Sequence, residues 1–383
     1  TCPRHGHEPQ PLQGMYLRLK RRFKLGCFVG SSFCSTNGVL QGCPLSVVLM
    51  NVMMQVWAQV VTTASPDLLA RAYADDASGA ARNPRDILRT IDPSQQFCAD
   101  TGMEMNTLKT HAWATIEAHR QMLHDALAPQ KIKVVLHERL LGAQMVYTRQ
   151  RVANVDVKER WDAAEAARQR VQALPLSMPE KAVLLGGAVT PKITFDSFVN
   201  PIADTTLQRW RGKLVRTMWG KSAPARCAEI ILSLFVKGHL VDIQLAAVIR
   251  IIRVMARMLQ RYPQYEQTLV NIIQARNPQA LEGGFISHRL QVSRVAVPFG
   301  PGVQFLWALG QLGWRFVGNV KTLRRLTTGE TFDLFTKDVK WLCHIMREDL
   351  RHMMRIDATL RRDDMQGLDT RDLDRKGTLA VHG

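Results

Sequence analysis

The chain contains 383 residues, enough for two or three domains, and its hydrophobic fraction of 46% is ordinary for a globular protein with a core. The charge is not ordinary, because 51 lysines and arginines against 33 acidic residues give a net charge of +18. This excess favours a polyanionic partner, with nucleic acid ahead of an anionic membrane surface. A basic soluble protein of another kind stays open as an alternative.

Cysteine usage and the apolar segments narrow the class further. The seven cysteines are scattered and form no CxxC pair, which argues against a disulfide framework or a zinc ribbon and favours a reduced, intracellular compartment. The longest apolar run, residues 228–259, is interrupted by Lys237, Asp242, Arg250 and Arg253. Charges at this density exclude a transmembrane span. The run therefore predicts packed helices with their arginines on the outer face, and no membrane partner.

The N-terminal region is expected to contain two helices separated by extended structure. In residues 12–25, apolar side chains recur at steps of three and four among basic ones, which predicts an amphipathic basic helix. An extended apolar stretch then ends at the turn signal Asn37-Gly38. Pro44 suits the first turn of a helix, and we expect that helix over about 45–61.

The next segments predict short strands and helices. Residues 70–82 predict a β-hairpin, 84–103 a helix broken at Pro93, and 109–116 a return to extended structure. Residues 131–147 predict one more strand pair. Strands and helices alternate here without a parallel βαβ rhythm, which indicates an α+β fold.

From residue 155 onward the chain is predicted to be mostly helical. Residues 157–174 and 205–220 predict long helices, and 336–363 predict a last charged helix. Residues 273–320 are punctuated by Gly and Pro, with FGPGVQF as a helix breaker.

The helix predicted over 205–220 combines basic residues with tryptophans. Aromatic side chains among basic ones can stack on nucleobases, whereas tryptophans at helical spacing are also typical of a buried core. Both interpretations stay open for Trp210 and Trp219. The candidates for contact with a nucleic-acid backbone are Arg209, Arg211, Lys213 and Arg216.

Two aspartates, Asp75 and Asp76, stand side by side in the predicted hairpin. Adjacent carboxylates on a strand point to opposite faces unless a tight turn intervenes, and their repulsion is costly unless a cation neutralises it. Mg²⁺ is the usual ion, because it prefers oxygen ligands and accepts water and substrate phosphates as its remaining ligands. Solvated carboxylates of an ordinary turn are the simpler alternative for the dipeptide alone.

Four sequence blocks follow one another around this dipeptide. They are NGVLQGCPLS at 37–46, YADD at 73–76, TGMEMNTLKT at 101–110 and RLLGAQ at 139–144. In this order and spacing they resemble motifs B, C, D and E of the reverse transcriptase family, specifically its non-LTR retrotransposon (LINE-like) branch. The resemblance in motifs covers about residues 12–150. A looser similarity to the helical thumb of these elements extends to about residue 265.

The resemblance implies catalytic roles for Asp75, Asp76 and Lys109, and a binding role for Tyr73. Asp75 would ligate the two catalytic Mg²⁺ ions with Asp76 beside it, so that one ion activates the primer 3′-hydroxyl and the other stabilises the leaving pyrophosphate. Tyr73 would lie near the primer end. Lys109 would protonate the leaving pyrophosphate as a general acid.

The resemblance also implies binding roles for two glycine-containing turns. Gln41 and Gly42 would line the pocket of the templating base and the incoming nucleotide, where glycine lets the backbone approach closely. Leu141 and Gly142 would form the primer grip. A simple strand turn is the alternative for this second pair.

The sequence departs from the family pattern at two places. Val47 stands where the family usually has proline, which slightly weakens the start of the helix. The family also supplies a further essential aspartate from a strand upstream of motif B, and residues 1–36 contain no aspartate. We therefore expect a chain that is N-terminally truncated with respect to the catalytic centre and inactive on its own.

The sequence thus predicts an α+β protein with partial fingers and palm over 1–150, a helical thumb-like region over 151–265 and a helical C-terminal region of unknown role over 266–383. Its family function would be RNA-directed DNA synthesis by two-metal nucleotidyl transfer, with an RNA template, a DNA primer, dNTPs and Mg²⁺. The alternative is a non-catalytic retroelement remnant that binds RNA or DNA nonspecifically through its basic surface. The family implies a nuclear location.

Overall fold

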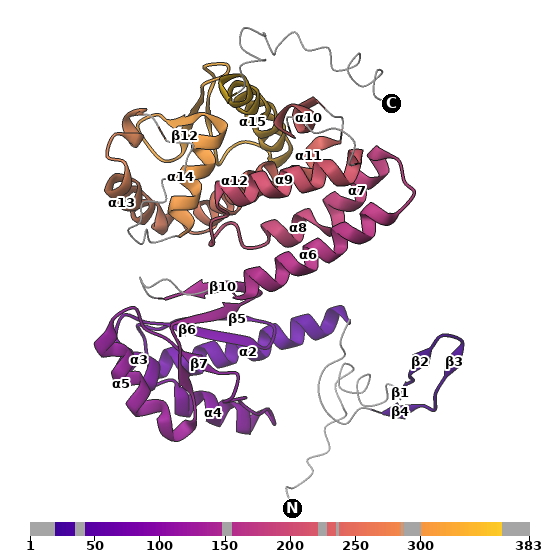
Figure 1. The fold of residues 1–383 in the computed structure, drawn as a ribbon. Coiled ribbons are helices and arrows are strands. Elements are labelled where there is room, and N and C mark those ends of the chain that lie inside the picture. The colour runs from indigo at the N-terminus through magenta and orange to yellow at the C-terminus, as the bar shows by residue number, and fades with distance from the viewer. Residues whose placement is uncertain are drawn as a thin grey trace, which may run out of the picture. The chain divides into compact units, whose positions relative to one another are not determined.

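The computed structural model describes residues 20–34, 43–147, 155–220, 228–234, 237–284, 286 and 300–361. The chain divides into two compact units, Thr1–Val134 and Val135–Gly383, and each unit is described by itself (Figure 1). Helices dominate both units and the sheets are small, which confirms the predicted α+β class.

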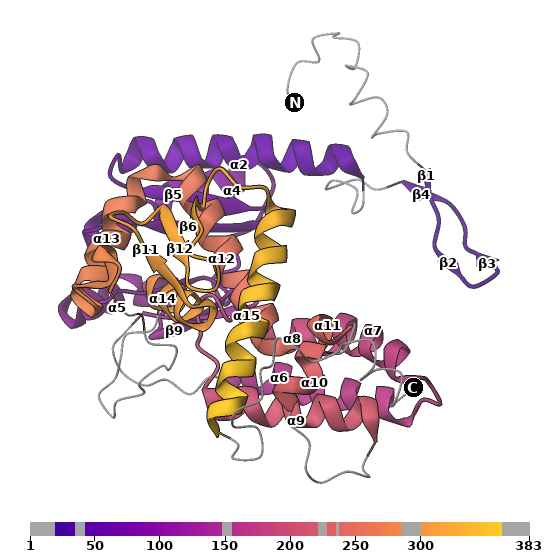
Figure 2. The same ribbon diagram turned by 90° about the horizontal axis from the view of Figure 1, so that it is seen from above.

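An antiparallel ribbon occupies residues 20–34 (Figure 2). It turns at Gly26, whose φ of 60° is left-handed, and Phe23 stacks on Phe33 with 5.1 Å between ring centroids. The predicted basic helix is therefore wrong for residues 20–25, because the glycine turn closes a hairpin there. Residues 12–19 and the turn signal Asn37-Gly38 lie outside the described residues. The ribbon consists of β1 (Lys20–Arg21) paired with β4 (Phe33–Cys34) and β2 (Lys24–Leu25) paired with β3 (Phe28–Val29).

The rest of the first unit is a small α+β assembly. The order of its elements is α2 (Pro44–Ala64), β5 (Leu69–Tyr73), β6 (Asp76–Ala80), α3 (Pro84–Leu88), α4 (Ile91–Asp100), β7 (His111–Ala112), α5 (Glu117–Leu127), the 3₁₀ turn η1 (Ala128–Gln130) and β8 (Lys133–Val134).

Helix α2 confirms the helix predicted after Pro44, with proline in its first turn. Among the described residues it is the one helix long and apolar enough to cross a membrane, by length and composition only. Its side chains Met54, Trp57 and Val61 are buried in a cluster with Phe97. One side of α2 therefore packs as a core helix does.

Two details of the first unit differ from the prediction. The break between α3 and α4 falls before Ile91, and Pro93 lies in the first turn of α4, where its missing N–H costs nothing. Strands β7 and β8 pair in parallel on either side of α5, so one short βαβ unit is present. These strands have two residues each, which is too short for a periodic signal in the sequence.

The second unit begins with a strand pair and continues mainly as helices. Its elements are β9 (His137–Leu140), β10 (Ala143–Val146), α6 (Val155–Ala173), α7 (Met178–Ala188), α8 (Thr190–Thr194), α9 (Asp204–Trp219), α10 (Ala228–Leu234), α11 (Gly238–Val241), α12 (Ile243–Arg261), η2 (Pro263–Tyr265), α13 (Glu266–Arg276), η3 (Ala280–Glu282), α14 (Pro301–Leu312), β11 (Trp314–Phe316), β12 (Thr322–Arg325), β13 (Thr331–Asp333) and α15 (Val339–Arg361).

One hydrophobic core runs through the second unit, from Ala164 on α6 to Met354 on α15. Helix α12 shows why these elements form, because it turns one apolar face into this core and four arginines away from it. Asp242 caps the helix by accepting hydrogen bonds from the backbone N–H groups of Gln244 and Leu245. The functional division predicted at residues 150 and 265 stays a prediction.

The C-terminal region contains more than the predicted helices. Strands β11, β12 and β13 form an antiparallel meander. Asp349 on α15 is buried beside it and accepts hydrogen bonds from Trp314, Arg325 and Thr327. The predicted breaker FGPGVQF is instead the start of α14, since Pro301 takes the first helical position.

Candidate functional site

Asp75 and Asp76 lie at the tip of the β5–β6 hairpin, where the sequence predicts a turn. Tyr73 pairs with Asp76 in register, so Ala74 and Asp75 are the two turn residues. Directly paired residues present their side chains to the same face of a hairpin, so Tyr73 and Asp76 share one face. Both aspartates and Tyr73 are exposed. No hydrogen bond or ion pair joins either carboxylate to another described residue.

The turn is held in a strained conformation. Ala74 has a φ of 53°, in the left-handed region. A positive φ at the first central position is what a tight two-residue hairpin loop requires, and glycine usually supplies it. Alanine there costs about 1 kcal/mol. Strain of this kind is typical of turns that position functional groups.

The two carboxylates suit a magnesium ion. Mg²⁺ is commonly held by one or two carboxylates, with waters and substrate phosphates as the other ligands. Asp75 and Asp76 offer such oxygens in an exposed position. Within the portion of the chain that the structure describes, no group of three or more His, Cys, Asp or Glu side chains could hold a metal. A third protein carboxylate therefore has no counterpart among these residues.

Lys109 occupies a separate turn of the same unit. Its backbone N–H donates to the carbonyl oxygen of Asn106 at 3.0 Å and to the Asn106 side chain at 3.2 Å, which fixes the turn. The Lys109 side chain is exposed, and among the described residues no hydrogen bond or ion pair joins it to the β5–β6 hairpin. Gln41 and Gly42, predicted to line the nucleotide pocket, lie outside the described residues.

Leu141 and Gly142 form the turn between β9 and β10. Both have positive φ values, 48° and 82°, as a two-residue type I′ turn requires. A Cβ atom on Gly142 would lie 3.1 Å from Cε1 of Phe195, so a side chain here would also press against this ring. Glycine at position 142 therefore lets the turn backbone lie close to the Phe195 ring of the same chain. Leu141 is 53% exposed at the turn's outer side.

The hairpin that carries this turn is fixed to the helices that follow it. Arg160 on α6 donates to the Gly142 carbonyl oxygen at 2.9 Å and pairs with Asp196 at 2.5 Å. Asn200 donates to the Gln144 carbonyl oxygen at 2.9 Å and to Asp196 at 2.8 Å. These bonds tie the hairpin to α6 and to the segment 196–200 that follows α8. The sequence does not predict this set, because a single arginine on a helix and a single asparagine in a loop carry no motif.

A comparison with protein families identifies the segment that carries both turns. Residues 8–144 match the family model of reverse transcriptase (RNA-dependent DNA polymerase). The match spans both glycine-containing turns, the β5–β6 hairpin and Lys109. The chain therefore contains a reverse transcriptase domain in this segment, a family that uses RNA as template for DNA synthesis. No curated protein matches the chain.

C-terminal to the segment that matches the family, α9 carries the residues predicted to contact a nucleic-acid backbone. These residues differ in how far they are buried. Arg211 is 1% exposed, and its guanidinium donates to Asp242 at 3.1 and 3.2 Å. The prediction that Arg211 contacts a nucleic-acid backbone therefore disagrees with its position inside the core. Arg209 and Arg216 are exposed on the same helix. Trp210 is buried, which favours the core interpretation of this tryptophan.

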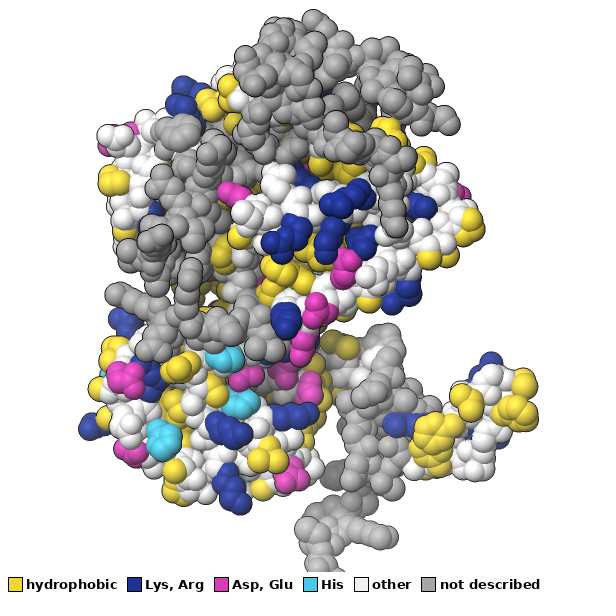
Figure 3. All heavy atoms as spheres, viewed as in Figure 1, with side chains coloured by type: hydrophobic (Ala, Val, Ile, Leu, Met, Phe, Trp, Pro, Cys, Tyr) yellow, Lys and Arg dark blue, Asp and Glu magenta, His cyan; other side chains and the backbone are white. Residues whose placement is uncertain are grey.

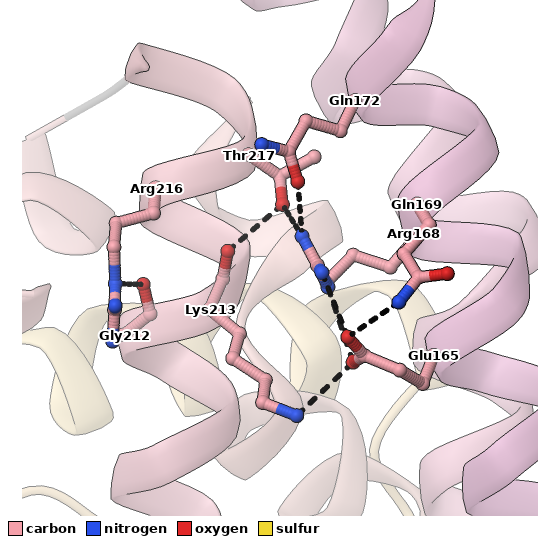
Figure 4. Close-up of polar contacts among 8 residues, drawn as sticks. All are labelled: Glu165, Arg168, Gln169, Gln172, Gly212, Lys213, Arg216 and Thr217. Atoms are coloured by element: carbon pink, nitrogen blue, oxygen red, sulfur yellow. Dashed lines mark hydrogen bonds and ion pairs between the residues drawn. The ribbon is translucent and has the colours of Figure 1, made fainter. Parts of the chain in front are cut away.

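Lys213 is tied into a polar network between α6 and α9 (Figure 4). Glu165 accepts from Lys213 at 3.1 Å and from Arg168 at 2.7 Å, and Arg168 also donates to Thr217 at 2.7 Å. The hydrogen bond from Arg168, more than any other contact, lowers the pKa of Glu165 to about 2. Lys213 also lies 4.9 Å from the centroid of the Trp210 ring.

Lys and Arg side chains gather on the face of the second unit around α9 (Figure 3). Arg216 donates only to the carbonyl oxygen of Gly212 in its own helix, and the described residues contain no acidic partner for it. Its charge and that of Arg209 are therefore available to an external anion.

Proposed function

We propose that this chain belongs to an RNA-directed DNA polymerase of the non-LTR retrotransposon type, in which Asp75 and Asp76 hold Mg²⁺. One observation carries the proposal. Within the segment that matches the reverse transcriptase family, a strained two-residue turn presents two adjacent, exposed carboxylates that no described residue neutralises. A nuclear location follows from the proposal, because such elements insert into chromosomes.

The side chains on and near the hairpin would have different roles in nucleotide transfer. Mg²⁺ ions held here would supply Lewis-acid activation of the primer hydroxyl and charge stabilisation of the pyrophosphate. Asp75 and Asp76 would supply carboxylate oxygens. Tyr73 shares a face with Asp76 and offers an exposed ring for the primer end. Lys109 would give its proton to the pyrophosphate oxygen, as general acid.

The second unit would hold the primer strand. The turn at Leu141 and Gly142 is supported from behind by Arg160 and Phe195, so a strand resting on its exposed side meets a fixed surface. Rigid support matters because misplacement by about 1 Å can lower a rate on the order of a hundredfold. Gln41 and Gly42 would complete the nucleotide pocket.

The family pattern supplies a further aspartate upstream of motif B, and residues 1–36 contain no aspartate. We therefore expect residues 1–383 alone to give no primer extension on an RNA template. Loss of one ligand of a two-metal site lowers the rate by several orders of magnitude. If the wild-type chain extends the primer and Asp75→Asn does not, the further aspartate is not needed. The same result would support the assignment of Asp75 as a metal ligand.

The metal assignment is tested by Mn²⁺ binding, read by electron paramagnetic resonance with an RNA–DNA primer–template present. We expect Asp75→Asn to weaken Mn²⁺ binding by about tenfold or more, because one of the two adjacent carboxylates loses its charge. Asp67→Asn is the matched control, since Asp67 is an exposed aspartate just before the same hairpin. Equal Mn²⁺ affinity in wild type and Asp75→Asn would refute the metal site.

The second candidate function is nucleic-acid binding without catalysis. Arg209 and Arg216 favour it, because they are exposed on α9 and have no acidic partner among the described residues. A remnant of this kind binds RNA or DNA with strong salt dependence and shows no Mn²⁺ site that depends on Asp75. The same titration therefore separates the two functions.

A further inference from the structure

Helix α12 carries a row of arginines on one face, away from the core. Its sequence from Ile243 to Arg261 contains no aspartate or glutamate. At 100° per residue, the arginine positions fall within a narrow arc opposite the buried positions Val248, Ile252 and Met255. The row is Arg250, Arg253, Arg257 and Arg261, and we call it the α12 arginine row.

The described residues leave most of this charge unbalanced. Arg253, Arg257 and Arg261 have no acidic partner among them, and Nε of Arg253 is buried without a hydrogen-bond partner. Asp196 attracts Arg250 but is already paired with Arg160. Like charges three and four residues apart destabilise a helix by a few tenths of a kcal/mol per pair. A row that is unbalanced in the free protein gains stability when a polyanion binds it.

The row begins at the turn of residues 141–142. Arg250 donates to the Phe195 carbonyl oxygen at 2.7 Å and lies 5.8 Å from the centroid of the Phe195 ring. The same ring would contact a Cβ atom at Gly142. Burial lowers the pKa of Arg250, and Arg253 acts in the same direction. From this buried end, the row runs along the helix surface for about 16 Å at 1.5 Å per residue.

We propose that the α12 arginine row binds consecutive phosphates of a nucleic-acid strand, and that it extends the strand path that starts at the 141–142 turn. The continuity with that turn rests on the proposed function, whereas the phosphate binding does not. Arginine suits the task because its planar guanidinium donates two parallel hydrogen bonds to a phosphate. A strand with about 3.4 Å of axis per nucleotide would place some five phosphates along the row.

The chemistry of this face favours nucleic acid over an anionic membrane. A helix that lies on a membrane surface inserts Trp, Phe or Leu between its basic residues. The apolar side chains of α12 are instead buried in the core, among them Leu245, Ile251 and Leu259. Its outer face therefore offers charge and hydrogen-bond donors without an apolar wedge.

The test is the double variant Arg253→Gln/Arg257→Gln, with affinity for a labelled RNA–DNA hybrid measured by fluorescence anisotropy at several salt concentrations. Arg250 is left intact because it also holds Phe195. The matched control, Arg276→Gln/Arg324→Gln, removes the same charge from exposed arginines of the same unit. We expect the double variant to bind on the order of tenfold more weakly at about 0.1 M salt than the control. Its salt slope should fall by about 1.4 to 1.8.

Three outcomes would overturn the proposal. The first is a double variant that binds the hybrid with the same affinity and salt slope as the control. If Arg209→Gln/Arg216→Gln weakens binding in the same experiment, the proposed function still stands and only the α12 arginine row is excluded. The second is a wild-type chain that binds no hybrid, in which case both fail. The third is a double variant that loses binding only to vesicles of anionic lipid, which would assign the row to a membrane.

Discussion

At the scale of single residues, position decides what a basic side chain does. Arg209, Arg211, Lys213 and Arg216 lie within two turns of α9, and the sequence groups them as one basic set. The structure separates them, because Arg211 is buried against Asp242 and Lys213 is bound by Glu165. The sequence predicts the helix but not the partners, since Asp242 lies 31 positions and Glu165 lies 48 positions away along the chain.

Arg211 gives the first prediction at this scale. Replacing it with alanine leaves Asp242 buried without its cation, and removing one partner of a buried ion pair typically costs about 3–5 kcal/mol. We expect Arg211→Ala to lower the free energy of unfolding in urea by that amount. Arg209→Ala, the exposed control, should change it by less than about 0.5 kcal/mol. Equal stability of the two variants would mean that Arg211 is not held in the core.

At the scale of elements, the sequence predicts long patterned segments and misses short or ambiguous ones. The helices after Pro44 and over 155–173 follow from periodicity and proline position. The strands of the C-terminal meander have three or four residues each, too few for a periodic signal. Residues 20–25 fit a helical pattern, and the turn at Gly26 overrides it.

The candidate site was predictable to a similar degree. The sequence predicts the hairpin that carries Asp75 and Asp76, because its motif includes the turn residues themselves. It does not predict the strain at Ala74 or the support of the 141–142 turn by Arg160 and Phe195, since both arise from tertiary contacts. The roles of the site residues stay predictions, which metal binding and primer extension test.

The contacts of Glu165 with Arg168 and Lys213, between α6 and α9, predict how stability depends on pH. The pKa of Glu165 is lowered to about 2 from 4.5, so its stabilising effect is complete above pH 4.5 and is lost as the pH falls toward 2. We expect Glu165→Gln to be less stable than wild type by on the order of 2 kcal/mol at neutral pH. The difference should vanish near pH 2. Urea denaturation at several pH values measures it.

The control for this experiment is Glu159→Gln, an exposed glutamate on the same helix. Its stability should follow that of wild type at every pH to within about 0.5 kcal/mol. If the Glu165→Gln difference stays constant with pH, the carboxylate is not held in its charged form by Arg168 and Lys213.

At the scale of the whole molecule, the net charge of +18 is distributed unevenly over the described surface. In the second unit, cations without acidic partners among the described residues stand on α9 and along the α12 arginine row. In the first unit, the two carboxylates of the β5–β6 hairpin are exposed together. A polymerase needs this combination, because the nucleic-acid strand is negative and the metal ions at its reactive end are positive.

The salt dependence of affinity for an RNA template annealed to a DNA primer shows most directly whether the basic surface binds nucleic acid. About six phosphate contacts, two from α9 and four from the α12 arginine row, predict a slope of roughly −4 to −5 in a plot of log affinity against log salt. Affinity should then fall by a factor of about several hundred between about 50 and 200 mM salt. An affinity that does not change over this range would contradict the account, since the basic surface would then have no nucleic-acid partner.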